Sequence, residues 1–192
     1  MKFFIIFFFL FYSLNCFPNN LGSETGLKIP RYVSIKSNDV NVRVGPSKNY
    51  PILIKYIQKN IPVEIIQEHK NWRKIVDYNK NTGWIKKNLL KGDRFAIIKE
   101  TLNDVSYIYI NPKGFKIGEI KKNNIVRVNK CRMSWCYISY EKKYGWISKK
   151  NLWGVYKEET YNSGRFEFIE NYYWQIYLFL FEIRLFFNHR LI

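Results

Sequence analysis

The stretch GWIKKNLLKG at residues 83–92 decides the fold, because nearly the same letters stand again at 145–154 as GWISKKNLWG. The likeness extends upstream. The segment YIQKNIPVEIIQEHKNWRKI (56–75) aligns with EIKKNNIVRVNKCRMSWCYI (119–138), so that apolar residues fall on apolar residues and tryptophan on tryptophan. A repeat of this length predicts two copies of one small domain.

Each copy is expected to form β-strands. The runs VEIIQ (63–67) and VRVNK (126–130) are rich in β-branched residues, and SWCYISY (134–140) places aromatic and β-branched residues on alternating sides. Polar turns, some with glycine, separate these runs. About five short strands in about 60 residues cannot form two broad sheets, but they can close into a small, strongly bent barrel.

Four motifs of the first copy occur in order: NVRVGP at 41–46, an apolar strand, NWRKI at 71–75 and GWIKKNLL at 83–90. Together they resemble the bacterial SH3-like domain, often called SH3b, and the whole chain resembles tandem SH3-like proteins exported by alpha-type proteobacteria. The resemblance covers roughly 33–157 and implies an all-β fold of two tandem small SH3-like barrels.

The second copy departs from the family pattern at its opening. DVSYIYINPKG (104–114) contains Asn111-Pro112 but offers no clear partner for Arg43 or Gly45. We therefore expect its opening loop to differ from that of the first copy.

The division of the chain follows from these motifs. We expect a signal peptide at 1–16, a linker at 17–31, SH3-like domains at 32–92 and 93–157, and an apolar C-terminal tail at 158–192. The N-terminal apolar run is too short for a bilayer, which takes about 20 apolar residues, but it fits a signal-peptide core. The tail is expected to be a helix that docks on the second barrel or on a membrane surface, or else an extension without function.

Three cysteines occur, and one of them lies in the export signal. Cys16 is either removed by cleavage or is a lipoprotein acceptor; after its removal, Cys131 and Cys136 form an even set in an oxidising compartment. If the residues between them form a hairpin loop, their Cβ atoms oppose each other at about 4.5–5.5 Å, close to the disulfide range. Glu68 and Arg73 occupy the matching positions of the first copy, and a cross-strand contact permits such an opposite-charge pair.

Catalysis and metal binding have little support in the sequence. The only histidines are His69 and His189, too few to complete a metal site with the cysteines. A Gly-rich phosphate loop and a Ser–His–Asp set are both missing. We therefore predict no enzymatic activity, no cofactor and no metal.

The candidate ligand-binding residues all lie in the first copy: Arg43, Tyr50, Trp72 and Tyr78. In the SH3 family the position of Trp72 often faces the ligand groove, and Tyr50 and Tyr78 are expected on the same side. Aromatic rings on a shallow barrel face suit peptide or sugar stacking. Two alternatives stay open: Trp72 covers the open end of the barrel, and Arg43 braces the loop after Gly45 instead of facing a ligand.

The net charge of +17 indicates an acidic partner, or simply a chain whose default surface residues are Lys and Asn. Nucleic acid conflicts with the export signal. We therefore predict an exported, periplasmic or envelope-associated binding module that recognises peptide or glycan of the cell wall. The alternative is a protein–protein adaptor that regulates a wall enzyme.

Overall fold

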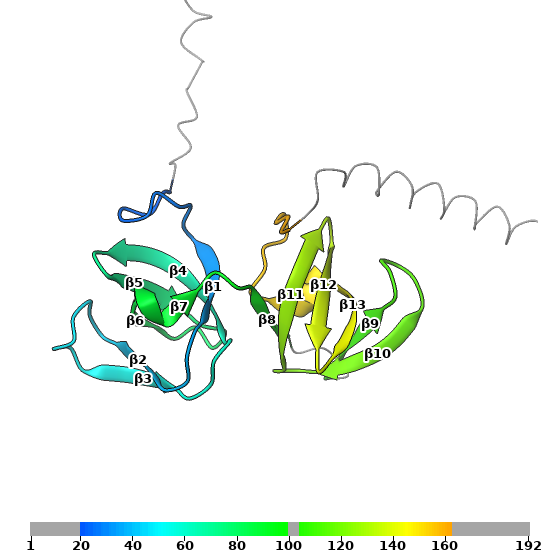
Figure 1. The fold of residues 1–192 in the computed structure, drawn as a ribbon, viewed down its shortest axis with the longest axis horizontal. Helices are drawn as coiled ribbons and strands as arrows, with labels where there is room; N and C mark the ends of the chain where they lie inside the picture. The colour runs from blue at the N-terminus through cyan, green and yellow to red at the C-terminus, as the bar shows by residue number, and fades with distance from the viewer. Residues whose placement is uncertain (1–19, 100–103, 163–192) are drawn as a thin grey trace, which may run out of the picture.

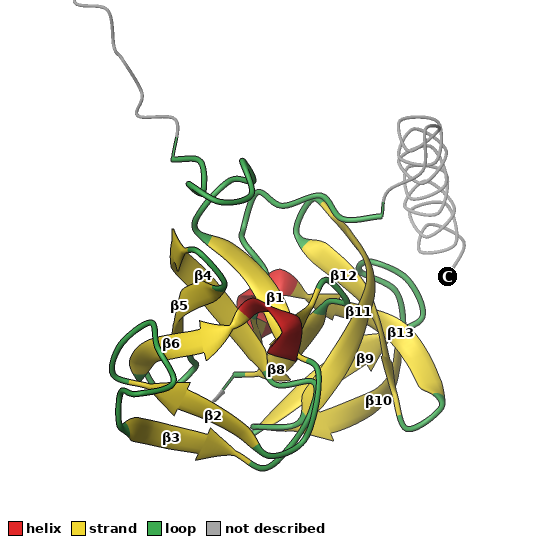
Figure 2. Cartoon of the chain, turned by 60° about the vertical axis from the view of Figure 1, so that its left-hand side comes forward, coloured by secondary structure: helices red, strands yellow, loops and turns green. Residues whose placement is uncertain are grey.

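The computed structural model describes residues 20–99 and 104–162, and Figure 1 draws the rest in grey. The predicted signal peptide, Cys16 and most of the apolar tail therefore lie outside the described residues. Strands dominate, and the two short helices coloured red in Figure 2 are single 3₁₀ turns. The described chain is all-β, as predicted.

The first copy is one antiparallel sheet of seven strands in the order β3-β2-β6-β5-β4-β1-β7. Its elements are β1 (Arg31–Ile35), β2 (Val40–Arg43), β3 (Ile52–Tyr56), β4 (Pro62–His69), β5 (Trp72–Val76), β6 (Thr82–Lys86), η2 (Lys87–Leu89) and β7 (Leu90–Lys91).

The second copy repeats this topology strand for strand, in the order β10-β9-β13-β12-β11-β8-β14. Its elements are β8 (Phe95–Ile98), β9 (Val105–Tyr109), β10 (Lys116–Lys121), β11 (Ile125–Arg132), β12 (Trp135–Tyr140), β13 (Lys143–Ser148), η3 (Lys149–Asn151) and β14 (Leu152–Trp153). The predicted repeat is therefore a repeat of the fold.

Each sheet bends around its own core of β-branched side chains. Strand alternation sends Ile75 and Ile85 into the first core and their counterparts Ile138 and Ile147 into the second, all of them fully buried. Trp84, next to Ile85, points the other way and is half-buried. The GWI motif thus supplies one core residue and one ring on the outer side of the sheet.

The opening hairpins of the two copies correspond in the structure, although their sequences differ. Arg43 on β2 pairs with Trp84 on β6, and Tyr109 on β9 pairs with Trp146 on β13. Tyr109 therefore takes the place of Arg43, a correspondence that the sequence alone did not give. Both hairpins also carry the same bulge, so that Ile54 lies opposite Val42 as Gly118 lies opposite Ile108.

The two copies form the two lobes of Figure 1, and side chains of both meet where the lobes adjoin. Tyr32 contacts Trp153 edge to face, with ring centroids 5.2 Å apart. Tyr78 also contacts Trp153 edge to face, with centroids 5.8 Å apart. The Tyr156 hydroxyl donates a 2.6 Å hydrogen bond to Glu64. Burial, together with the Glu64 carboxylate, raises the pKa of Tyr156, so this phenol stays protonated and remains a donor.

Candidate ligand-binding face

The outer side of the second barrel carries a run of aromatic side chains. Strands β9, β13 and β12 are neighbours in the sheet, and alternation turns every second residue of each strand outward. These outward positions hold six aromatic residues, Tyr107, Tyr109, Trp135, Tyr137, Tyr144 and Trp146. We call this set the aromatic face.

The rings of the aromatic face touch one another. Tyr109 meets Trp135 edge to face with centroids 5.4 Å apart. Tyr137 lies 5.4 Å from Trp146 and 6.4 Å from Tyr144, nearly parallel to the latter at 22°. Such offset and edge-to-face pairs are the favourable geometries for aromatic rings. The side chains therefore support one another and present a surface that is already organised.

Two cations lie against these rings. The Arg132 guanidinium lies 4.5 Å from the centre of the Trp146 ring, and the Lys116 ammonium lies 3.4 Å from that of Tyr107. Trp146 is buried and forms the floor, whereas Tyr144 is 57% exposed. Arg132 is itself buried, and Lys116 also lies 3.7 Å from the Glu119 carboxylate. The two cations therefore support the rings, and the flat rings can stack on a sugar or peptide.

The same outer positions of the first barrel are mostly not aromatic. Cross-strand pairing places Lys74 beside Trp84 as Tyr137 lies beside Trp146. The positions that match the aromatic face hold Asn41, Arg43, Trp72, Lys74, Thr82 and Trp84. Sequence reasoning looked for the ligand face in the first copy, whereas the structure gathers aromatic side chains in the second.

Trp72 is only 9% exposed, which favours the alternative left open above, that it covers the end of the barrel. Its cross-strand neighbours are His69 on β4 and Lys86 on β6, which stand beside it on the same side of the sheet. Tyr78 does not join it in a groove either. Its ring packs on Trp153 of the second copy.

Arg43 and Tyr50 do come together, in the loop that follows β2. Arg43 Nη1 donates a 2.7 Å hydrogen bond to the Tyr50 carbonyl oxygen, which agrees with the bracing role left open above. The Tyr50 ring lies over Gly45 so closely that a Cβ there would come within 2.6 Å of it. A glycine is therefore required at this close approach, and the ring itself stays 46% exposed.

A disulfide joins Cys131 and Cys136, which face each other on β11 and β12. The turn is tighter than the sequence suggested, because Arg132 also pairs with Trp135 and only Met133 and Ser134 lie between the strands.

In the first copy, Glu68 and Arg73 pair at the corresponding place, with Arg73 Nε 3.2 Å from the carboxylate. Arg31 Nη2 and the backbone N–H groups of Glu24 and Thr25 also donate to Glu68. Burial alone would raise the pKa of this carboxyl, but the hydrogen bonds and the Arg73 charge outweigh it and lower the pKa to about 2.

Within the part of the chain that the structure describes, no group of three or more His, Cys, Asp or Glu side chains could hold a metal ion. Over the same residues, no helix reaches the length and apolarity that a membrane span requires.

Two repeated antiparallel sheets, each ending in a 3₁₀ turn and a short last strand, define a tandem of SH3-like barrels. The family model of the bacterial SH3 domain matches residues 36–92 and 117–154, and the chain belongs to this family. The second match begins at β10, beyond the opening segment whose sequence departs from the family pattern.

Solved structures with similarity to the chain include NlpC1 and NlpC2 from Trichomonas vaginalis, both 15% identical, with TM-scores of 0.28 and 0.30. The matches cover 69% and 70% of this chain, which spans about half the length of those proteins, 48% and 51%. The endolysin LysPBC5 CBD is also 15% identical, with a TM-score of 0.28, over 64% of this chain and 92% of that one. The search of curated proteins gave no match.

Proposed function

We propose that this protein is a non-catalytic binding module of the cell envelope, and that the aromatic face of its second SH3 copy recognises peptide or glycan of the cell wall. One observation carries the proposal: six aromatic side chains lie on three neighbouring strands. A face of this kind is larger than the packing of the barrel requires, since the first copy folds the same way without it.

The chemistry of the face suits wall polymers. Tyr and Trp rings offer flat apolar area at low cost in side-chain entropy, with polar groups at their edges. Arg132 and Lys116 hold the rings of Trp146 and Tyr107 by cation–π contacts, and the net charge of +17 attracts anionic polymers over a longer range. Short-range stacking and long-range attraction are therefore separable contributions to affinity.

Export to the envelope remains our expectation from the N-terminal sequence, and the disulfide supports it, because such bonds persist in oxidising compartments. The boundaries 32–92 and 93–157 remain our proposed division into domains. The candidate residues Arg43, Tyr50, Trp72 and Tyr78 are no longer our first choice for the ligand contact.

A second candidate function is an adaptor that regulates a wall enzyme. The observation that favours it is strand β3, which lies at the edge of the first sheet and exposes Ile52 and Leu53, with Ile57 just beyond. An edge strand with exposed apolar side chains can pair with a strand of another protein.

A pull-down on isolated peptidoglycan with salt titration tests the proposal. The parent protein should bind the wall material, and Tyr137→Ala should bind it less at every salt concentration. Lys74→Ala makes the matched change in the first copy and serves as the control. If Tyr137→Ala and the parent bind equally well, the aromatic face is not the site. If neither binds, the adaptor function is favoured.

A further inference from the structure

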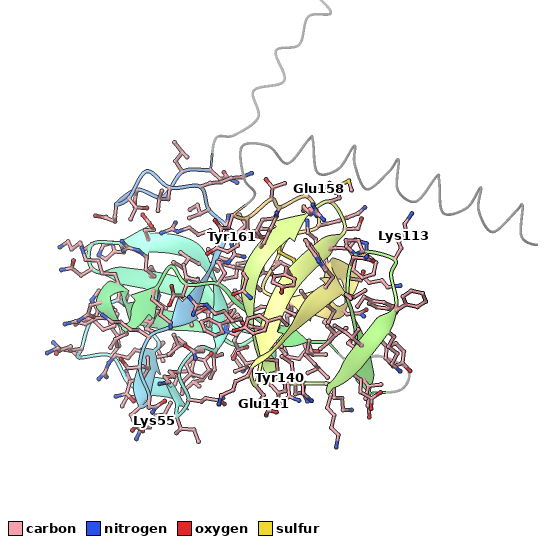
Figure 3. The ribbon with its side chains drawn as sticks, turned by 45° about the vertical axis from the view of Figure 1, so that its right-hand side comes forward. Lys55, Lys113, Tyr140, Glu141, Glu158 and Tyr161 are labelled. Carbon is pink, nitrogen blue, oxygen red and sulfur yellow. A yellow bond between two sulfur atoms is a disulfide. The ribbon has the colours of Figure 1, made fainter. Side chains whose placement is uncertain are left out.

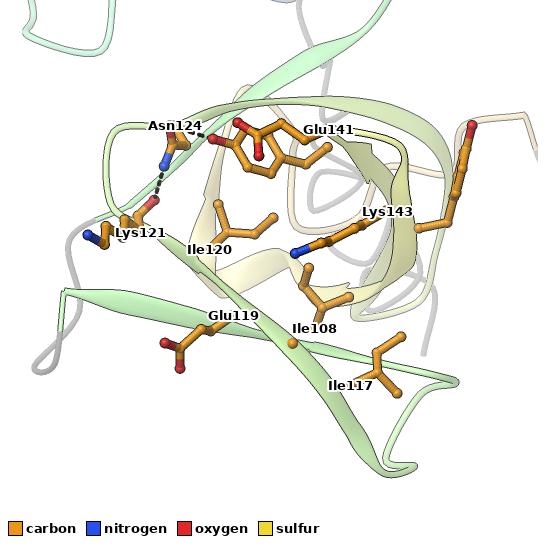
Figure 4. A pocket seen from close by; sticks show the side chains of 11 residues that line it. Ile108, Ile117, Glu119, Ile120, Lys121, Asn124, Glu141 and Lys143 are labelled. Atoms are coloured by element: carbon orange, nitrogen blue, oxygen red, sulfur yellow. Dashed lines mark hydrogen bonds between the residues drawn. The ribbon is translucent and has the colours of Figure 1, made fainter.

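A cavity opens at one end of the second barrel, beside Tyr144 of the aromatic face. Its volume is about 580 Å³, and apolar side chains of β9 and β10 line its inner part (Figure 4). Tyr140 and Glu141, which border it, lie at the opposite end of the second lobe from Tyr161 (Figure 3). Tyr161 pairs with Cys131, so the cavity lies at the end of the barrel away from the disulfide.

The first barrel fills the same place with its own side chains. Tyr56, on the strand that corresponds to β10, is buried there and donates a 2.8 Å hydrogen bond to Asp77. Register places Ile120 at the position of Tyr56, because Ile120 pairs with Ser106 as Tyr56 pairs with Val40. The second barrel carries its ring at this end on β12 instead, because Tyr140 follows Ser139 as Asp77 follows Val76, and Tyr140 packs against the second core.

The other inward position of β10 also carries a smaller side chain than its counterpart in the first barrel. Ile54 packs against the first core, whereas its counterpart is Gly118. A Cβ built on Gly118 would meet a single atom within 4 Å, Ile108 Cδ1 at 4.0 Å, so the space in front of this residue is open. Both inward positions of β10 thus carry smaller side chains than those of β3, which leaves space in front of this strand although Tyr140 on β12 replaces Asp77.

The lining of the cavity contains two lysines, Lys121 and Lys143, and two glutamates, Glu119 and Glu141. Lys143 extends along the hollow between Ile120 and Ile108 (Figure 4), and among the described residues it forms no ion pair. Glu119 lies 3.7 Å from the ammonium group of Lys116. A carboxylate that enters with an apolar group would find its counter-charge at Lys143.

We propose that this cavity binds an aromatic side chain that stands next to a carboxylate, as at the C-terminal residue of a peptide ending in Phe or Tyr. The ring would lie in front of Gly118, beside Ile120 and Tyr140, and Lys143 would receive the carboxylate. The volume lies within the range of about 300–1,000 Å³ that is usual for small-ligand sites. The site adjoins the aromatic face at Tyr144, which lines the cavity, but its other lining residues lie outside that face, and ligand binding here does not depend on the function of that face.

N-acetyl-phenylalanine is the probe, and its amide is the matched ligand without the charge. With the ¹⁵N-labelled full-length protein, the carboxylate should shift the amide resonances of Gly118 and Tyr140, with a Kd of about 1 mM or tighter. The uncharged amide should bind at least about fivefold more weakly. Lys143→Gln should remove that preference, whereas Lys142→Gln, a change in the same turn but outside the cavity lining, should keep it.

Gly118→Ile gives the second barrel the side chain of the first and should fill the cavity. We expect binding of the probe to fall at least about tenfold while the thermal midpoint stays or rises. Should this variant not fold, Ile120→Tyr fills the space from the next inward position. Trp135→Ala should leave probe binding unchanged, which separates this site from the aromatic face.

Three results would overturn the proposal. One is a parent protein whose Gly118 and Tyr140 resonances do not move at millimolar probe. Another is a set of shifts centred on Trp135 instead. The third is a folded, cavity-filled variant that binds the probe as well as the parent does.

Discussion

At the scale of single residues, the two copies hold the same pair of strands together by different chemistry. In the second copy Cys131 and Cys136 form a covalent bond, and in the first Glu68 and Arg73 form a buried ion pair. The alignment of the two pairs could be made from the sequence. The additional partners of Glu68 could not be predicted from the sequence, because Arg31 and the segment around Thr25 reach it only in the folded chain.

Our first prediction concerns the thiols. Protein taken from its native compartment should show no alkylation at Cys131 or Cys136 by intact mass, and replacing both with serine should lower the free energy of unfolding by about 2 kcal/mol, as the chain-entropy model gives for so short a loop. Urea denaturation of the two forms measures the second quantity. Full labelling of both cysteines would refute the prediction.

Our second prediction concerns Glu68. Its side chain is fully buried and its pKa is lowered from 4.5 to about 2, so its ionised form stabilises the folded state. That contribution is fully present above about pH 4.5 and is lost as the pH falls toward 2, so the free energy of unfolding should fall through this window. Glu68→Gln should lower it by about 3–5 kcal/mol at pH 7, because it leaves buried arginine charge without its partner.

Denaturant titrations at several pH values measure both effects of Glu68. Glu158→Gln, at an exposed carboxylate, is the control and should change the free energy of unfolding little. Equal stability of Glu68→Gln and the parent protein at pH 7 would contradict the prediction.

At the scale of elements, the strands of both copies could be predicted, because GWI and the β-branched runs fix their period and their turns. The aromatic face was not predicted, because the family motifs that suggested ligand residues all lie in the first copy. Its signal is the alternation in YIY (107–109), WCYI (135–138) and YGWI (144–147), which puts rings on one side and core residues or glycine on the other. That these three segments are neighbours depends on sheet order, which no single segment contains.

Our third prediction compares matched tryptophans at the start of β5 and β12. Trp72 is buried, so Trp72→Ala should lower the free energy of unfolding by about 3–5 kcal/mol. Trp135→Ala should destabilise the fold less but weaken wall binding by about 1–3 kcal/mol. Because stacking is short-range and little screened, this loss should be similar at low and high salt, whereas the contribution of exposed lysines is screened over about 8–10 Å.

Thermal denaturation and the peptidoglycan pull-down, run on the same preparations, separate the two effects. A folded Trp72→Ala protein that loses wall binding, beside a Trp135→Ala protein that keeps it, would return the ligand site to the first copy.

At the scale of the whole molecule, the two barrels have separate cores but touch at their surfaces. The first core draws its residues from 29–90 and the second from 96–161. The repeat made two domains predictable. The contact between the two domains was not predictable from the repeat. Trp153 lies in a position that the first copy fills with Lys91, and Tyr156 follows the last strand, beyond the end of the repeat.

Our last prediction follows from this arrangement: a fragment of residues 17–92 should fold by itself, with dispersed amide resonances. Its core contains no residue of the second copy, and the contacts it loses are peripheral. They include the Tyr32 and Tyr78 rings on Trp153, the Tyr32 ring on Tyr156 with centroids 4.7 Å apart, the Arg94 guanidinium over Tyr32, and the Glu64–Tyr156 hydrogen bond. The loss should cost about 1–3 kcal/mol in the free energy of unfolding. Tyr156→Phe in the full chain removes the hydrogen bond alone and should cost about 1 kcal/mol. If the fragment is unfolded while the tandem is folded, the first barrel depends on the second to fold, and our proposed boundary at 92–93 does not separate independent domains.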